Sequence, residues 1–283
     1  MNRTMRCNGL LYLLKRTRVM GIVNITPDSF FAQSRVTSGK EILNRCEKML
    51  SDGADILDIG ACSTRPGADP VSFEEEYRRL SEALKVIRHE YPRVLLSLDT
   101  YRSEIARRMT GEFGIGMIND ISGGSLDPDM FSVVAELQVP YVLMHMQGTP
   151  KTMQASPLYE DVVGEVSLWF ARKTAELHAL GVSDIILDPG FGFGKSLEHN
   201  YGLLAHLNDF SIHDLPVLVG VSRKTMIQKL LGVTADQALN GTSAVHMAAL
   251  LSGRVDFLRV HDVKEAVECI KIAEALKGNY TDF

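Results

Sequence analysis

Short runs of apolar residues alternate with longer amphipathic segments along most of this chain. Eight such runs occur between residues 19 and 260, and each is followed by a segment of helical pattern. The runs are continuously apolar, which is typical of parallel strands that are covered on both faces. The predicted strands are Val19–Ile25, Ala54–Ile59, Val94–Leu98, Ile115–Ile121, Val139–Met144, Ser183–Leu187, Pro216–Val221 and Val255–Val260.

The segments between the runs carry apolar residues at helical spacing. Ser72 followed by Glu75 is the start of a capping box and predicts where one of these helices begins. A long helix is predicted from about residue 159 to residue 180, with Gly181 ending it, and a last helix at Val263–Leu276. Two apolar stripes are Ile42, Leu43, Cys46, Met49 and Leu50, and Tyr77, Leu80, Leu84 and Ile87.

Eight strands, each followed by a helix, within about 250 residues predict an α/β fold of the single-domain (β/α)8 barrel type. The alternative is an open, doubly wound sheet, which needs no particular number of strands. That fold favours a glycine-rich first turn, and this chain has none. We therefore expect one catalytic barrel over residues 19–283, with residues 1–18 as an N-terminal segment that caps the bottom of the barrel.

Length and composition support one large domain, because 283 residues with 45% apolar content can bury a large core. The net charge of −5 and the lack of a basic run argue against a nucleic-acid partner and favour a small anionic substrate. The four cysteines lie far apart, so we expect reduced thiols in a cytoplasmic protein. We expect no export, because Leu10–Leu14 is too short for a signal segment. No apolar stretch approaches the roughly 20 residues of a membrane span, so we also expect no membrane partner.

Polar residues lie at or just after the carboxyl end of every predicted strand, and these ends carry the active site in barrels of this type. A single polar residue there is usually a helix cap or a loop residue, but eight of eight indicate a site. The set comprises Asn24, Ser63 to Arg65, Asp99, Asn119, His145, Asp188, Ser222 to Lys224, Arg259 and His261.

The glycine-rich stretch that follows Asp188 suggests a nucleotide-binding loop, but the spacing argues against one. Pro189 stands where a Walker loop needs its first glycine, and proline has no backbone donor for a phosphate. What this stretch predicts is a carboxylate, Asp188, held at the end of a strand. His145 is interpreted as a hydrogen-bonded core histidine.

The polar set divides into two chemical groups. Asp99, Asn119, Asp188 and Lys224 offer acceptors and donors that suit the edge of a flat heterocycle with N–H and carbonyl groups. The second group suits a diphosphate and its magnesium ion, because arginine gives forked donors and asparagine gives the hard oxygen that magnesium takes. An alternative for Arg259 is a salt bridge to a neighbouring carboxylate. The second group comprises Asn24, Thr64, Arg65, Arg259 and His261.

Six segments together resemble the motif set of the dihydropteroate synthase family of pterin-binding enzymes. They span nearly all of the chain from Val19 to the final helix and follow the family's order. The segments are Met20 to Phe30, Ser63 to Gly67, Asn119 to Gly124, Asp188 to Lys195, Gly220 to Lys224 and Arg259 to His261.

The resemblance implies a barrel enzyme of folate synthesis that condenses 4-aminobenzoate with (7,8-dihydropterin-6-yl)methyl diphosphate and releases pyrophosphate. It implies catalytic roles for Asp99, Lys224 and Arg259, with Asp99 stabilising the cation of a dissociative step. It also implies a homodimer and an enzyme of a class that sulfonamides target. The implied pterin-binding residues are Asp99, Asn119, Met144, Asp188, Phe193, Gly220 and Lys224.

The resemblance assigns the diphosphate, metal and aminobenzoate sites in the same way. Asn24 is implied as the magnesium ligand. The implied diphosphate residues are Thr64, Arg65, Arg259 and His261. The implied aminobenzoate residues are Phe30, Pro66, Ser222 and Thr225.

Three positions depart from the family pattern. The first loop reads Phe31-Ala-Gln-Ser-Arg35 in place of the common Ser-Asp-Gly-Gly, Cys62 replaces a usual glutamate, and Gln147 replaces a frequent arginine. Two rival functions also fit a pterin-binding barrel: a methyltransferase that passes a methyl group to a corrinoid protein, and a binding protein without catalysis. The anion-binding motifs at Ser222 to Lys224 and Arg259 to His261 argue against both.

Overall fold

The structure is a computed structural model that describes residues 3–25, 35–62, 71–149, 153 and 157–278. Its centre is an eight-stranded sheet in which all neighbouring strands are parallel. The strands are β3 (Arg18–Asn24), β4 (Ile56–Gly60), β5 (Leu95–Asp99), β6 (Met117–Asp120), β7 (Tyr141–Met144), β8 (Ile185–Asp188), β9 (Leu218–Val219) and β10 (Phe257–Val260).

The sheet curls into a barrel, as the sequence predicted. The order of strands is β8-β7-β6-β5-β4-β3-β10-β9. A parallel bridge between Leu187 and Val217 joins its two edges, and the Leu187 amide donates to the Pro216 carbonyl at 2.8 Å. Each of the eight predicted runs overlaps one strand, and all strands except β3 and β5 are shorter than their runs because the apolar residues continue into the connecting loops.

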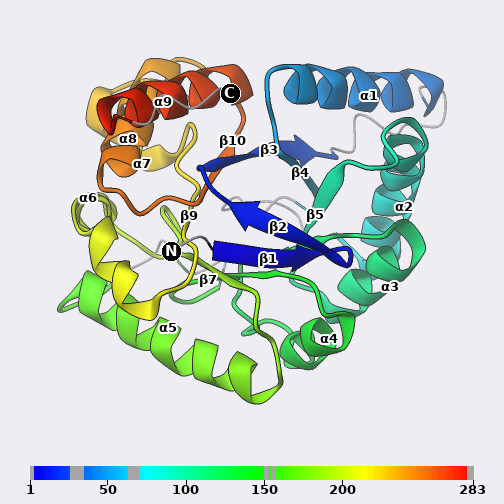
Figure 1. Cartoon of the computed structure of the whole chain (residues 1–283), viewed down its shortest axis with the longest axis horizontal. Coiled ribbons are helices and arrows are strands. Elements are labelled where there is room, and N and C mark those ends of the chain that lie inside the picture. Colours follow the sequence, from blue (N-terminus) through cyan, green and yellow to red (C-terminus); the bar gives the residue numbers. More distant parts are fainter. Residues whose placement is uncertain (1–2, 26–34, 63–70, 150–152, 154–156, 279–283) are drawn as a thin grey trace.

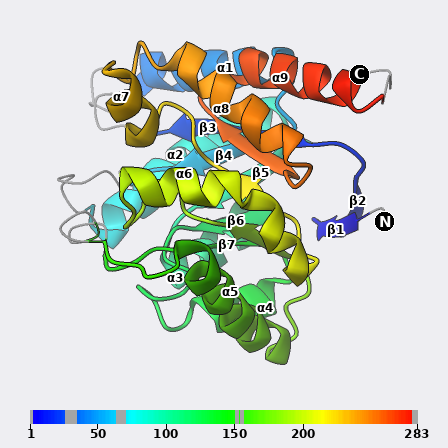
Figure 2. The same ribbon diagram turned by 90° about the vertical axis from the view of Figure 1, so that its left-hand side faces the viewer.

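Helices surround the barrel, and Figures 1 and 2 show them as an outer layer around the strands. Their apolar faces pack on the outward side chains of the strands in one continuous core. No helix among the described residues is long and apolar enough to span a membrane. The helices are α1 (Arg35–Ser51), α2 (Phe73–Glu90), α3 (Ser103–Phe113), α4 (Met130–Leu137), α5 (Val162–Ala179), α6 (Leu197–Ala205), α7 (Thr225–Leu231), α8 (Leu239–Leu251) and α9 (Val263–Leu276), with a 3-10 helix at Leu207–His213.

Two predicted helix starts differ in detail from the structure. Ser72 accepts a hydrogen bond from the Glu75 amide, but the Glu75 carboxylate pairs with Arg78 and Arg79 instead of completing a capping box. The long helix α5 begins at Val162 and not near residue 159. Its N-cap is Asp161, whose side chain accepts hydrogen bonds from the backbone amides of Val163 and Gly164. The final helix matches its predicted bounds.

One end of the barrel interior is closed by apolar side chains. The antiparallel hairpin of β1 (Arg3–Cys7) and β2 (Leu10–Leu14) lies across this end in Figure 1, and its Met5, Cys7 and Leu14 pack there. Each of the eight barrel strands contributes one residue to the same cluster. These residues are Met20, Ile56, Leu95, Met117, Val142, Ile186, Leu218 and Phe257.

The alternation of side chains along a strand fixes which residues form the next layer of the interior. A residue two positions further along the strand points inward again. Counting on from the apolar cluster, the second layer therefore comprises Ile22, Asp58, Ser97, Asn119, Met144, Asp188, Gly220 and Arg259. Two residues after Ile22 and Ser97, Asn24 and Asp99 also face inward, so the polar residues converge at the carboxyl ends of the strands.

Candidate active site

An ion-paired centre lies in the second interior layer. The Arg259 guanidinium places Nε 2.6 Å from Asp58 Oδ2 and Nη2 2.5 Å from Asp99 Oδ2. Asn119 Nδ2 donates to the same Asp58 oxygen at 3.0 Å. The salt bridge considered for Arg259 from the sequence is therefore present. Asp58 was not predicted as a site residue, although a charged residue inside an apolar run was a signal that could have revealed it.

Burial shifts the protonation of the acidic groups in this centre. It raises the pKa of Asp99 to about 7; Arg259 opposes the rise, and the nearby charges of Asp58, Glu76 and Asp120 add to it. Burial also raises the pKa of Asp188, while the positive charge of Lys224 opposes that rise. At neutral pH, Asp99 is thus close to the midpoint of its titration.

Lys224 and the loop after β8 form one side of the site. Lys224 Nζ donates to the Phe191 carbonyl at 2.6 Å and lies 4.8 Å from the centre of the Phe193 ring. Burial lowers the pKa of Lys224 to about 8, and Asp188 opposes this, so the ammonium form prevails at neutral pH. The Gly190 amide donates to Asp188 Oδ1 at 2.8 Å and holds that carboxylate at the strand end.

Two predicted pocket residues, Met144 and Gly220, occupy the same inner layer. Met144 is buried and pairs in register with Asp188 across β7 and β8. A side chain at Gly220 would place its Cβ 3.8 Å from Lys224 Nζ and 3.9 Å from Arg259 Cβ. Glycine therefore leaves the space beside Lys224 Nζ and the Arg259 Cβ free of side-chain atoms.

A buried lysine, Lys195, joins two loops beneath the site and was missed as a functional position. Its Nζ lies 3.1 Å from His145 Nδ1 and 3.0 Å from the carbonyls of Gly190 and Phe193. Burial lowers the pKa of Lys195 to about 7 and that of His145 to about 3. His145 is therefore a neutral, hydrogen-bonded core histidine, as expected, and Lys195 is its partner.

Ser222 and His261 contact each other at the ends of β9 and β10. Ser222 Oγ lies 3.1 Å from His261 Nδ1 and accepts from the His261 amide at 3.2 Å. Burial and the neighbouring Arg259 lower the pKa of His261 to about 4. His261 is consequently neutral near pH 7 and can serve an anion as a hydrogen-bond donor, not as a cation. Thr225 is exposed at the first position of α7.

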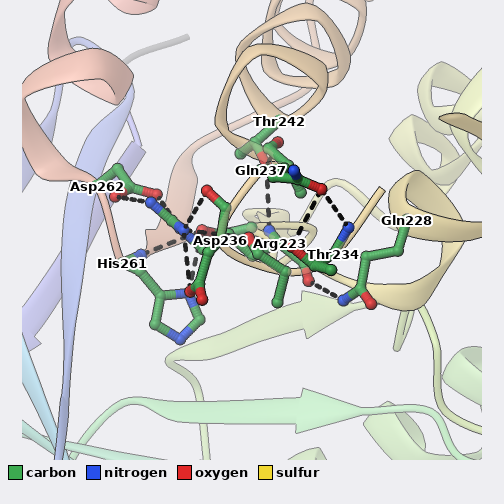
Figure 3. A network of polar contacts seen from close by, with 11 residues as sticks. Arg223, Gln228, Thr234, Asp236, Gln237, Thr242, His261 and Asp262 are labelled. Atoms are coloured by element: carbon green, nitrogen blue, oxygen red, sulfur yellow. Dashed lines mark hydrogen bonds and ion pairs between the residues drawn. The ribbon is translucent and has the colours of Figure 1, made fainter. Parts of the chain in front are cut away.

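Arg223 lies between two site residues but does not face the anion side of the site. Figure 3 shows its guanidinium held by Asp262, with Nε and Nη2 at 2.7 and 2.8 Å from the two carboxylate oxygens. Its Nη1 also donates to the carbonyls of Ala235 and Asp236. From the sequence, Ser222 to Lys224 were predicted to bind an anion. For Arg223 this prediction was wrong, because its side-chain donors already bond to other groups of the protein.

Arg223 also has an unusual backbone, with φ of 55° in the left-handed region. Side-chain hydrogen bonds hold it on both sides: Thr242 Oγ1 accepts from its amide at 3.1 Å, and Gln228 Nε2 donates to its carbonyl at 2.7 Å. These contacts fix the turn that carries Ser222 and Lys224. Arg223 therefore stabilises the turn that positions the site residues and does not face the ligand itself.

Two departures from the family pattern have clear surroundings. Gln147 is bonded through both side-chain atoms to the backbone of Leu158, at 2.9 and 3.1 Å, so it ties two parts of the loop after β7 together. Cys62 is half-buried, and burial followed by the charge of Glu76 raises its thiol pKa. Glu76 itself is buried. It forms an ion pair with Arg102 and accepts a hydrogen bond from the hydroxyl of Thr100, the residue that follows Asp99 in the sequence.

Of the remaining predicted residues, one is exposed at a strand end and the others lie outside the described residues. Asn24 is exposed at the end of β3, on the carboxyl side of the barrel. Within the described residues there is no cluster of three or more histidine, cysteine or acidic groups that could hold a metal by itself. Phe30, Thr64, Arg65 and Pro66 lie outside the described residues, as does the altered first loop up to residue 34.

Comparison with known proteins gives a consistent result. The family model described as pterin binding enzyme matches residues 20–261. Dihydropteroate synthase of Escherichia coli K12 is 43% identical over 264 residues, covering 93% of this chain and 92% of the relative. The Synechocystis enzyme of the same name is 40% identical over 265 residues, covering 93% and 91%.

Solved structures agree with the sequence relatives. A crystal structure of Yersinia pestis dihydropteroate synthase with a sulfonamide drug complex superposes with a TM-score of 0.89 at 41% identity, covering 98% of this chain and all of that one. Xanthomonas albilineans dihydropteroate synthase with 4-aminobenzoic acid superposes with a TM-score of 0.87 at 38% identity, covering 98% and 99%.

Proposed function

The chain belongs to the pterin-binding enzyme family and is a dihydropteroate synthase, a transferase of folate biosynthesis, and we propose how its residues divide that reaction. The observation that carries the proposal is the convergence of Asp99, Asn119, Asp188, Lys224 and Arg259 at the carboxyl end of the barrel interior. This group combines a hydrogen-bonding edge with half-buried cations, as a pterin diphosphate requires.

We assign the pterin ring to Asn119, Asp188 and Lys224. Asp188 has one oxygen bonded to the Gly190 amide, so its other oxygen can accept from ring N–H groups. Lys224 can donate to a ring carbonyl or nitrogen, and the half-buried Phe193 ring lies beside it. Met144 and the open space at Gly220 complete the ring pocket.

The diphosphate belongs on the other side, near Arg259, His261 and Asn24. Arg259 uses Nε and Nη2 for Asp58 and Asp99, and its Nη1 bonds to no other described residue. Thr64 and Arg65 join this group by family resemblance. A magnesium ion fits these donors, because magnesium usually takes one or two protein oxygens and completes its shell with phosphate and water. Asn24 can supply that protein oxygen, and the bound ion would neutralise charge on the departing pyrophosphate.

The chemistry follows from the leaving group. The bond between the exocyclic carbon and the diphosphate oxygen breaks, and pyrophosphate keeps both electrons. A cation conjugated with the pterin ring remains, and the Asp99 carboxylate stabilises it electrostatically. The neutral arylamine then attacks this carbon, and its excess proton leaves to solvent or pyrophosphate. No obligatory general base is needed, and Lys224 and Arg259 act by binding and charge stabilisation.

We place 4-aminobenzoate between the first two loops and the turn after β9. Phe30 and Pro66 would contact the ring, with Ser222 and Thr225 near its carboxylate. The buried Ser222 hydroxyl already bonds to His261, so the exposed Thr225 is the more accessible of the two. Sulfonamides would occupy the same place. Pyrophosphate with magnesium should raise the affinity for a sulfonamide, because the anion-binding residues Asn24 and Arg65 are close in sequence to Phe30 and Pro66; equal affinity with and without them, measured by calorimetry, would count against this arrangement.

A coupled assay for pyrophosphate release tests the function directly. Release should require both the pterin diphosphate and 4-aminobenzoate, and dihydropteroate should form in equal amount. A methyltransferase would release no pyrophosphate, and a binding protein without catalysis would bind the pterin but turn nothing over. Either of those outcomes would overturn the proposal.

We further propose a homodimer that uses the late helices. Five large apolar side chains are exposed on α7, α8 and α9, which lie together in Figure 2. They are Leu230, Leu231, Leu251, Ile272 and Leu276. Light scattering should give twice the chain mass, and Ile272→Lys should shift the protein to monomer. We also propose a cytoplasmic location, supported by four free thiols.

A further inference from the structure

A buried carboxylate, Asp58, lies under the proposed pterin site and has no role in the reaction described above. It lies in the middle of β4, two residues after Ile56 of the apolar cluster, and has no exposed surface. Its Oδ2 accepts from both Asn119 Nδ2 and Arg259 Nε, whereas its Oδ1 is buried with no hydrogen-bond partner among the described residues. Such a group is unfavourable for folding.

Asp58 decides how the Asn119 amide is oriented. An asparagine amide has a donor end and an acceptor end, and its surroundings determine which end faces which way. An ionised carboxylate only accepts, so the reverse orientation would set the Asn119 carbonyl against the Asp58 oxygens. With Nδ2 directed to Asp58, the acceptor Oδ1 is the end turned away from it.

Asp58 also constrains the guanidinium of Arg259. The Nε–H bond to Asp58 and the Nη2–H bond to Asp99 fix two donors of one planar group. The plane of the guanidinium is thereby set by two carboxylates from neighbouring strands, since β4 and β5 pair in register. The Nη1 group is left for an anion.

We propose that Asp58 is a positioning residue that makes Asn119 a hydrogen-bond acceptor toward the ligand. The site therefore selects a ring that presents a donor, an amino group or a ring N–H, at that point of its edge. This inference rests on the proposed assignment of the pterin ring to Asn119.

An exchange of the two side chains tests the inference. Asn119→Asp places two carboxylates against each other and should weaken binding of 6-hydroxymethyl-7,8-dihydropterin about tenfold or more. Adding Asp58→Asn to the Asn119→Asp chain restores one amide donor and one carboxylate acceptor. The donor is then at position 58 and the acceptor at position 119. The amide at position 58 can donate to the new carboxylate, but the atom that donates then no longer accepts from Arg259 Nε, so the double variant should regain part of the lost affinity.

Calorimetry with this pterin alcohol, which lacks the diphosphate, isolates the Asn119 contact from the anion contacts. The single variant Asp58→Asn should weaken binding in the wild-type background but have little effect in Asn119→Ala, because its action passes through the amide. A purely structural role would lower affinity equally in both backgrounds. A double exchange that binds no better than Asn119→Asp alone, or folds no better, would overturn the inference.

Ser97→Ala is the matched control. Ser97 pairs in register with Asp58 on the adjacent strand, is equally buried, and its hydroxyl has no described partner. Its removal should leave pterin affinity within about twofold, since it positions neither Asn119 nor Arg259. If the wild-type protein binds no pterin alcohol, the proposed function fails; if it binds but the exchange gives no recovery, only the role of Asp58 fails.

Discussion

The two ends of the barrel interior are built from the same eight strands but are opposite in character. At the amino end, each strand contributes one apolar side chain, and the β1–β2 hairpin packs on that layer. Two residues further along the strands, the same inward-facing row contains Asp58, Asn119, Asp188 and Arg259. Apolar burial stabilises the barrel at one end, whereas the other end holds charges that folding alone does not favour.

Charged groups occur at both ends, and their bonding differs. Asp55, at the amino end, accepts two hydrogen bonds from Arg16, one from Arg18 and one from the Val19 amide, so both of its oxygens are satisfied. At the carboxyl end, one buried oxygen of Asp58 accepts from no described residue, and the pKa of Asp99 is raised to about 7. Saturated ion pairs hold the scaffold, while incompletely satisfied ones mark the place where substrate is to bind.

The largest effect that should separate the two ends is on the rate. Asp99→Asn keeps the shape of the side chain but removes the charge that would stabilise the pterin cation. We expect kcat to fall by about 10² to 10³, because the charge matters more in the transition state than in the ground state. Binding of the pterin diphosphate should stay within about tenfold of wild type.

Single-turnover rates and the pterin dissociation constant, measured on the same Asp99→Asn protein, check this expectation. If affinity is lost while turnover at saturation stays near normal, Asp99 only positions the ring and the proposed cation stabilisation is wrong.

The next effect compares two aspartates at opposite ends of β8. Asp188→Asn, at the carboxyl end of β8, should leave a ring N–H without its acceptor and weaken pterin binding by about 1 to 3 kcal/mol. Its control is Asp184→Asn, just before the same strand, where the carboxylate accepts from the Arg6 amide of the hairpin. Calorimetry should find pterin affinity unchanged in the control. Similar losses in both variants would remove the distinction between the two ends.

A third variant should affect stability but not activity. Asp55→Asn removes a charged acceptor from Arg16, Arg18 and the Val19 amide, and we expect it to lower the free energy of unfolding by about 2 kcal/mol. Denaturant titration measures that loss. Activity per folded molecule, from kcat/KM at 20 °C below the wild-type melting temperature, should be unchanged; a drop in kcat/KM would show that the amino end contributes to the chemistry.

The smallest effect concerns pH. Asp99 must be ionised to stabilise the cation, and its raised pKa of about 7 means that the active fraction falls as the pH is lowered through neutrality. Between pH 8 and pH 6, kcat/KM should decline about tenfold. Lys195 also has a pKa of about 7, so the residual activity of Asp99→Asn serves as the control. An acid limb that persists in that variant would assign the titration to another group.

Much of the architecture could be predicted from the sequence. Continuous apolar runs of strand length, separated by amphipathic segments, are compatible with few folds, and eight of them within this length give a barrel. Strand ends then indicated Asp99, Asn119, Asp188, Lys224 and Arg259 without reference to contacts. The ends of the elements were less certain: β9 contains two residues of a predicted six, because apolar character continues where the ladder has stopped.

Only the tertiary structure decided which polar groups meet. Asp58 and Arg259 are separated by 201 positions and come together inside the barrel because β4 and β10 both pair with β3. Pairing of β9 with β10 and of β7 with β8 likewise brings Arg223 to Asp262 and Lys195 to His145. The Arg223 donors are taken up within the protein, whereas Nη1 of Arg259 bonds to no described residue. The sequence by itself determined the strands, the inward-facing positions and the residue types at their ends, because those depend on local periodicity. Pairing depends on the register between distant strands and on loop conformation, and these are fixed only when the whole barrel has formed.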